Sequence, residues 1–142
     1  MILDAYAVLA LLKGEPAAAP VAALLTRGDV RITSVGFAEI VDHLVRIVGS
    51  SEDDAVLDVA QLGLADALPV DAMIGSAAGA LRARHYRRRH RAVSLADCVA
   101  AEAARNVGVA LVSADPHLLD LCRDEGIDRV PLPDSAGRMW SG

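Results

Sequence analysis

The sequence is poor in cysteine and in aromatic residues. Aromatic side chains make up 3% of its 142 residues, and the only cysteines are Cys98 and Cys122. Two cysteines cannot form the dense disulfide framework of a small secreted domain. Both lie in apolar, helix-like runs, where we expect them to be buried as small hydrophobic side chains rather than to act in redox chemistry. The cysteine content therefore favours a cytoplasmic protein.

Long hydrophobic runs are also absent. The apolar opening MILDAYAVLALLKGEP has no basic start, contains Asp4, and is broken by Lys-Gly-Glu-Pro. It lacks the basic region of a secretory signal and the roughly 20 apolar residues of a membrane-spanning helix. We interpret it as a buried strand followed by a helix, in a protein without a membrane partner.

Apolar residues make up 54% of the chain, so the core must be built from Ala, Val, Leu and Ile. A chain of this length fits one domain, which we expect to span residues 1–142. Apolar runs of strand length alternate with longer helical stretches, and runs such as MIL and VALV are typical of strands covered on both faces. The sequence predicts an α/β fold, a three-layer α/β/α sandwich with a mostly parallel central sheet. The expected strands are 1–3, 30–33, 109–113 and 130–132, with a shorter one at 68–70.

Helix periodicity is clearest after Ser34, where apolar residues recur at spacings of three and four until Gly49. A capping-box pattern, Ser94-Leu95-Ala96-Asp97, begins a second helix that runs to Gly108. Asp115-Pro116 begins a third, with Asp as the cap and Pro in the first turn. Further helices are predicted at 5–12, 17–26, 53–62 and 71–83.

Four acidic residues map to the carboxyl ends of the predicted strands, where open parallel sheets bind ligands. Asp4 ends the first strand, Glu39 lies early in the helix after the second, and Asp97 and Asp115 flank the strand 109–113. Grouped carboxylates repel one another unless a cation neutralises them. Mg²⁺ or Mn²⁺ suits oxygen ligands and activates water for attack on phosphorus. The pattern therefore indicates phosphodiester hydrolysis.

Each of these residues also has a purely structural interpretation. Asp97 and Asp115 would stabilise helix starts by roughly 0.5 to 2 kcal/mol as caps, and Glu39 alone would be a solvated helix residue. Asp4 is harder to explain in this way, because it stands between an apolar strand and an apolar helix. Cap and metal roles are compatible, since a helix N-terminus favours negative charge in either case.

The segments LDAYAVLALLKGEP, SVGFAEIVDHL and SLADCVAAEAARNVGVALVSADPHL resemble the PIN-domain family, in particular VapC-type ribonuclease toxins, over nearly the whole chain. The resemblance implies a parallel sheet between helices, one or two Mg²⁺ or Mn²⁺ ions, and endoribonuclease activity. It also implies a homodimer and a small antitoxin that covers the active site. The acidic quartet that it implies is Asp4, Glu39, Asp97 and Asp115.

Within this resemblance, Asp4 and Asp97 are the expected principal metal ligands, and Asp115 completes the coordination or binds a second ion. Glu39 would hold a water on the ion or assist its deprotonation. Ser113 matches a small hydroxyl residue of the family and could orient that water or a ligand carboxylate. Tyr6 departs from the family, where a small hydroxyl residue is frequent, so a bulky side chain could narrow the entrance.

Basic residues are concentrated in one segment of a chain whose net charge is −5. The segment RARHYRRRHR could contact RNA phosphates. It could equally be a solvated helix end, or pair with an acidic antitoxin or with the protein's own acidic body. Its six arginines are Arg82, Arg84, Arg87, Arg88, Arg89 and Arg91.

The histidines do not have the spacing of a zinc site. His43 lies one turn after Glu39, and His117 follows Asp115 by two residues. For both we favour a surface histidine over contact with the site. Serine-hydrolase and phosphate-loop patterns are absent.

The sequence therefore predicts a Mg²⁺- or Mn²⁺-dependent endoribonuclease, the cytoplasmic toxin of a toxin–antitoxin pair. One alternative is a catalytically silent PIN-like module that binds RNA or protein, although such a module gains nothing from keeping four carboxylates. Another is a metal-dependent phosphatase of a different α/β family. That family's pattern has a second Asp two residues after the first, where this chain has Tyr6.

Overall fold

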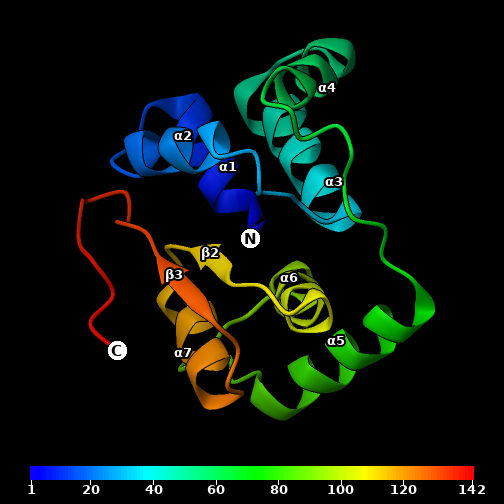
Figure 1. The fold of residues 1–142 in the computed structure, drawn as a ribbon, viewed down its shortest axis with the longest axis vertical. Helices are drawn as coiled ribbons and strands as arrows, with labels where there is room; N and C mark the ends of the chain where they lie inside the picture. The colour runs from blue at the N-terminus through cyan, green and yellow to red at the C-terminus, as the bar shows by residue number, and fades with distance from the viewer.

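The centre of the fold is a short parallel sheet, seen in a computed structural model that describes residues 1–142 (Figure 1). Its strands lie in the order β1-β2-β3 and are joined by parallel pairing, with Ile2 opposite Leu111 and Val112 opposite Val130. The strands are β1 (Ile2–Leu3), β2 (Leu111–Ser113) and β3 (Arg129–Pro131).

The prediction of strands at 30–33 and 68–70 is wrong, since neither range forms a regular strand, but both lie beside the sheet as expected. Their residues form isolated parallel bridges, Ile2 with Arg31 and Thr33 with Leu68. The amide of Leu68 donates to the carbonyl of Ile32 at 2.7 Å. The pairing stays this short because Thr33 already caps the next helix, so the chain leaves the sheet at once. The predicted strand 109–113 is likewise shorter, and the last strand begins one residue earlier than predicted.

The predicted helices are confirmed, with small changes at their ends. The helix after Ser34 reaches Gly49 as expected, but its last turn widens into a π-helix, η1. The helix predicted at 71–83 continues to His85. The helical elements are α1 (Ala5–Lys13), α2 (Ala18–Thr26), α3 (Ser34–His43), η1 (Leu44–Val48), α4 (Glu52–Gln61), α5 (Ala72–His85), α6 (Leu95–Val107) and α7 (Pro116–Asp124).

The helix ends have the local chemistry that the sequence predicts. Ser94 and Asp97 form the complete capping box of α6, and Asp115 caps α7 with Pro116 in the first turn. Gly49 and Gly108 end their helices in the left-handed conformation, with φ of 85° and 70°, which side chains with a Cβ rarely adopt.

The sheet has an apolar core on each face. Along β1, Leu3 belongs to a cluster with α1 and α3, whereas Ile2 belongs to a cluster with α5, α6 and α7. Along β2, Val112 and Leu111 alternate in the same way. Since neighbouring strand residues point to opposite faces, helices cover both sides of the sheet. The predicted α/β sandwich is therefore confirmed (Figure 1).

Cys98 and Cys122 are buried free thiols in the second of these cores, as predicted. No single helix combines the length and hydropathy of a membrane span. The one pair of helices that does so jointly, α1 with α2, is bent by 110° between them.

Candidate active site

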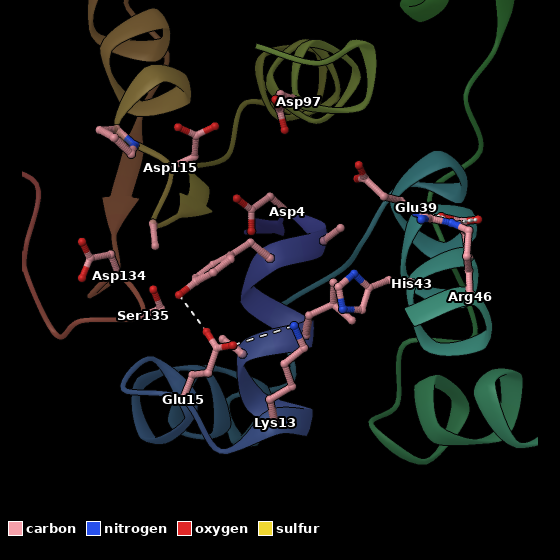
Figure 2. Close-up of a pocket in the computed structure, with 17 residues that line it drawn as sticks. Asp4, Lys13, Glu15, Glu39, His43, Arg46, Asp97, Asp115, Asp134 and Ser135 are labelled. Atoms are coloured by element: carbon pink, nitrogen blue, oxygen red, sulfur yellow. Dashed lines mark hydrogen bonds and ion pairs between the residues drawn. The ribbon is translucent and has the colours of Figure 1, made fainter. Parts of the chain in front are cut away.

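A cavity of about 550 Å³ opens at the carboxyl ends of β1 and β2. All four predicted acidic residues line it, and each comes from a different part of the fold (Figure 2). Asp4 follows β1 and caps α1, Glu39 lies on α3, Asp97 is in the first turn of α6, and Asp115 caps α7. The fold thus brings together carboxylates that are far apart in the sequence.

Backbone amides hold the three aspartates in place. Asp4 Oδ1 accepts from the amide of Ala7 at 2.8 Å. Asp97 Oδ2 accepts from the amide of Ser94 at 2.7 Å. Asp115 Oδ1 accepts from the amide of His117 at 2.8 Å. Each contact fixes a carboxyl group at a helix start.

Ser113, at the end of β2, contacts the carboxyl group of Asp4 and the backbone of Asp115. It is fully buried, and its Oγ accepts from the backbone amide of Asp115 at 2.9 Å. Its hydroxyl also hydrogen-bonds to the carboxyl group of Asp4 and lowers the pKa of that group. Ser113 therefore lies where it can orient a ligand carboxylate, which is the role that the sequence suggests for it.

The electrostatics of the cavity oppose ionisation of its carboxyl groups. The pKa of Asp4 is raised to about 7, mainly by burial and in smaller part by the charges of Asp97 and Asp115, against the opposing hydrogen bonds. Burial also raises the pKa values of Glu39 and Asp115, and the Asp97 charge adds to both. None of these four carboxylates forms an ion pair with a basic side chain. Their charge is therefore left for a bound cation to neutralise.

The donor set suits a hard divalent ion in its chemistry. It consists of carboxylate oxygens, which Mg²⁺ and Mn²⁺ prefer, and it lines a single cavity. As the side chains stand, no three His, Cys, Asp or Glu residues are arranged to coordinate one ion. Mg²⁺ typically keeps several waters and takes one or two protein carboxylates, so a closed set of three is not required.

The opposite wall of the cavity holds Tyr6, which the sequence places at the entrance, together with residues that sequence reasoning did not select. The hydroxyl of Tyr6 donates to Glu15 Oε2 at 3.0 Å, so the ring is held against the cavity wall. Lys13 forms an ion pair with the same glutamate at 3.8 Å. Asp134 and Ser135 reach the cavity from the chain after β3, and no local pattern indicates this.

The interpretation of His43 as a surface residue is wrong. His43 lines the cavity, and its Nε2 is buried without a hydrogen-bond partner. Burial lowers its pKa, and the charges of Lys13 and Arg46 lower it further. Its spacing of one turn from Glu39 was the available signal, because residues four apart share one helix face. His117 is not among the lining residues.

The arginine-rich segment lies away from the carboxylate cavity. Arg84 and Arg91 pair with Glu125 and Asp124, near the end of α7 opposite to Asp115. Arg82 Nε donates to the carbonyl of Val93 at 3.1 Å. Arg84 and Arg91 therefore pair with acidic residues of the protein itself, which is one of the alternatives that the sequence left open. The other members, Arg87, Arg88 and Arg89, are exposed.

The fold and the cavity together define an α/β sandwich with a carboxylate-lined site at the carboxyl ends of its parallel strands. The family model described as PIN domain matches residues 1–124, and the chain belongs to the PIN-domain family. Proteins of this family are generally nucleases. The family match also argues against the α/β phosphatase alternative.

Among solved structures, the crystal structure of FitAcB from Neisseria gonorrhoeae is similar to this chain, with a TM-score of 0.64 and 16% identity. The similarity covers 90% of this chain and 94% of that one. At this identity it supports the fold alone. Among curated protein sequences, no match to the chain was found.

Proposed function

We propose that this protein is a metal-dependent endoribonuclease that uses Mg²⁺ or Mn²⁺. The observation that carries the proposal is the convergence of Asp4, Glu39, Asp97 and Asp115 on one cavity without a basic partner. Holding four carboxylates together costs free energy. A cation recovers that cost, and the same cation suits phosphodiester hydrolysis.

The aspartates divide the work of holding the ion. Asp4 and Asp97 are the principal ligands, and Asp115 completes the coordination or binds a second ion. When bound, the ion neutralises phosphate charge and makes the attacking water more acidic. Ser113 keeps the carboxyl group of Asp4 oriented.

Glu39 accepts the proton of the attacking water. It lies on α3 at the edge of the cavity, where a substrate can reach its side chain. Burial and the charge of Asp97 raise its pKa, which brings it closer to the range where a carboxylate is an effective base at neutral pH.

The biological role that we propose is that of the cytoplasmic toxin of a toxin–antitoxin pair, with a small antitoxin and a second copy of the chain as partners. The VapC-type resemblance suggests this role. An exposed apolar surface supports a protein partner. The exposed apolar side chains are Ile47, Val48, Val56 and Leu57 on η1 and α4, and Val56 also lines a groove with Phe37, Val41 and Val45.

Replacement of single carboxylates tests the nuclease. Asp4→Asn and Asp97→Asn should each reduce Mg²⁺-dependent cleavage of single-stranded RNA to background, because each removes a ligand charge. Glu39→Gln should slow cleavage by roughly 10² to 10⁴-fold, as expected for loss of a proton acceptor. Cleavage is followed on a labelled RNA with Mg²⁺, with Mn²⁺ and with a chelator.

Asp53→Asn is the matched control, because Asp53 is an exposed aspartate in the first turn of α4. It should leave the cleavage rate unchanged. Full activity of Asp4→Asn, or cleavage that persists in chelator, would refute the metal site. RNA binding without cleavage by the metal-loaded wild type would favour the catalytically silent module instead.

A further inference from the structure

A second concavity, of about 250 Å³, is lined only by basic side chains. It lies near the end of α7 opposite to the carboxylate cavity, and no hydrophobic residue lines it. Since the protein as a whole is acidic, with a net charge of −5, a basic hollow is a local exception. We call it the arginine pocket, and its residues are Arg84, His85, Arg87, His90 and Arg91.

Two pieces of backbone build the arginine pocket. The last turn of α5 supplies Arg84 and His85. The chain then turns back on itself, and Arg87 and Arg91 pair as an antiparallel bridge, with reciprocal N–H to carbonyl hydrogen bonds of 2.9 and 2.8 Å. This pairing brings both residues, with His90 between them, beside the helix end.

Acidic residues from α7 and the residue after it hold part of the arginine pocket in place. Glu125 accepts from Arg84 at 3.3 Å and contacts His85 Nε2. Asp124 accepts from Arg91 at 2.7 Å, and the same guanidinium contacts His85 Nδ1 at 2.9 Å. These contacts order three of the five lining side chains before any ligand arrives.

The other two lining residues have no carboxylate partner. Arg87 donates to the carbonyl of Tyr86 at 2.8 Å, and its remaining N–H groups are available. His90 forms no ion pair. The arginine pocket therefore combines ordered donors with positive charge that the protein does not neutralise.

We propose that the arginine pocket binds a phosphate group of the RNA chain, outside the carboxylate cavity. This inference rests on the proposed function, because it takes RNA to be the substrate. Guanidinium groups match phosphate oxygens in geometry and charge. A docking site for a protein would need an apolar centre, which this pocket lacks.

The position of the arginine pocket defines its role. Asp115 and Asp124 stand at opposite ends of α7, a nine-residue helix about 13 Å long. A strand bound at both places would run along this side of the molecule. Contacts to phosphate fix the position of a nucleic acid without reading its sequence. The arginine pocket thus positions RNA, and base selection belongs elsewhere.

Ring signals of the histidines report on the arginine pocket in the unmodified protein. His85 and His90 lie in it, whereas His117 lies near the other end of α7. Inorganic phosphate, and then single-stranded RNA in chelator, is titrated against chloride at equal ionic strength. The ring NMR signals of His85 and His90 should shift saturably and that of His117 should not. No response to either probe would overturn the proposal.

Two double variants separate the arginine pocket from a general basic surface. Arg87→Ala with Arg91→Ala should weaken RNA binding about tenfold at low salt and reduce the salt slope by about 1 to 2. Arg88→Ala with Arg89→Ala removes the same charge from the same turn but from residues outside the pocket lining. This control should change the dissociation constant less than about threefold.

If both double variants weakened RNA binding equally, the proposal would be overturned. It would also be overturned if an acidic peptide shifted the ring signals of His85 and His90 at a lower concentration than RNA does. The proposed nuclease activity can be refuted independently of the arginine pocket. If metal-loaded wild type binds RNA through the arginine pocket but does not cleave it, the pocket stands and the catalytic assignment falls.

Discussion

Asp4 is the residue where burial most strongly opposes the ionised carboxylate that a metal site requires. It is only 6% exposed, between β1 and α1, yet its carboxyl group both caps α1 and lines the cavity. Burial outweighs the hydrogen bonds from Ser113 and Ala7, so its pKa rises to about 7. In the absence of a cation, ionisation of Asp4 therefore destabilises the folded protein.

This conflict predicts a pH-dependent stability of the metal-free protein. The unfolded carboxyl group ionises near its ordinary pKa of 3.8, but the folded one ionises only near 7. Between these values the folded state binds more protons, so the free energy of unfolding decreases as pH rises, and it levels off above about 7. Asp4→Asn keeps a capping side chain but cannot ionise. Relative to wild type, it should therefore gain stability over this range, by a few kcal/mol at most.

Urea unfolding of both proteins from pH 4 to 8, in chelator, measures this difference. Adding Mg²⁺ at pH 8 should raise the melting temperature of wild type and leave that of Asp4→Asn unchanged. Parallel pH curves for the two proteins would show that Asp4 does not carry the raised pKa.

At the scale of elements, the start of α6 serves both folding and the site. The amide of Asp97 donates to Ser94 Oγ at 3.0 Å, and the amide of Ser94 donates to Asp97 Oδ2 at 2.7 Å. The capping box thus positions a cavity carboxylate with the same contacts that begin the helix. The helix cap and the proposed metal ligand are one residue here, which is why the structural interpretation of Asp97 does not exclude the functional one.

Ser94→Ala separates these two contributions. It should lower the free energy of unfolding by about 1 kcal/mol, because the amide of Asp97 loses its side-chain acceptor. Cleavage should decrease far less than in Asp97→Asn, since Asp97 keeps its backbone donor. Ser76→Ala, at an exposed position in the middle of α5, is the control and should change stability by less than about 0.5 kcal/mol. If Ser94→Ala and Asp97→Asn reduced cleavage equally, the effect of both would come from disruption of the helix start and not from loss of the Asp97 carboxylate.

At the scale of the whole molecule, charge is separated along α7. Seven carboxylates and two permanent cations line the cavity near Asp115, whereas five basic side chains line the arginine pocket near Asp124. A polyanion would be repelled from the first site unless metal is bound, and attracted to the second in either case. On the proposed function, metal binding therefore decides whether RNA can enter the carboxylate cavity.

The toxin proposal predicts that expression of the intact chain without an antitoxin arrests growth. The arrest should require the nuclease, so Asp4→Asn should be harmless and Asp53→Asn should arrest growth as wild type does. Growth curves and the integrity of cellular RNA measure this. Normal growth with abundant folded wild-type protein would contradict the toxin role and leave the nuclease to be tested in vitro.

The sequence by itself determined the helices and the acidic positions. Helix ends depend on residues a few positions apart, such as Ser94 with Asp97, so local patterns locate them well. Asp4 and Asp115 could be selected because each follows an apolar strand, and strand ends of a parallel sheet share one edge. The lengths of strands could not be read in this way, since pairing at 30–33 stops where Thr33 turns to cap α3.

Only the tertiary structure decided which distant side chains meet. His43 proved to line the cavity, and Ser135 joined it from the chain after β3, because both placements depend on how separate elements pack. The arginines of the basic segment differ in their partners for the same reason. Arg84 and Arg91 found carboxylates 41 and 33 residues away, while Arg88 and Arg89 stayed exposed. A charge pattern along the chain cannot show this, because electrostatic interactions depend on distance in space and not on separation in sequence.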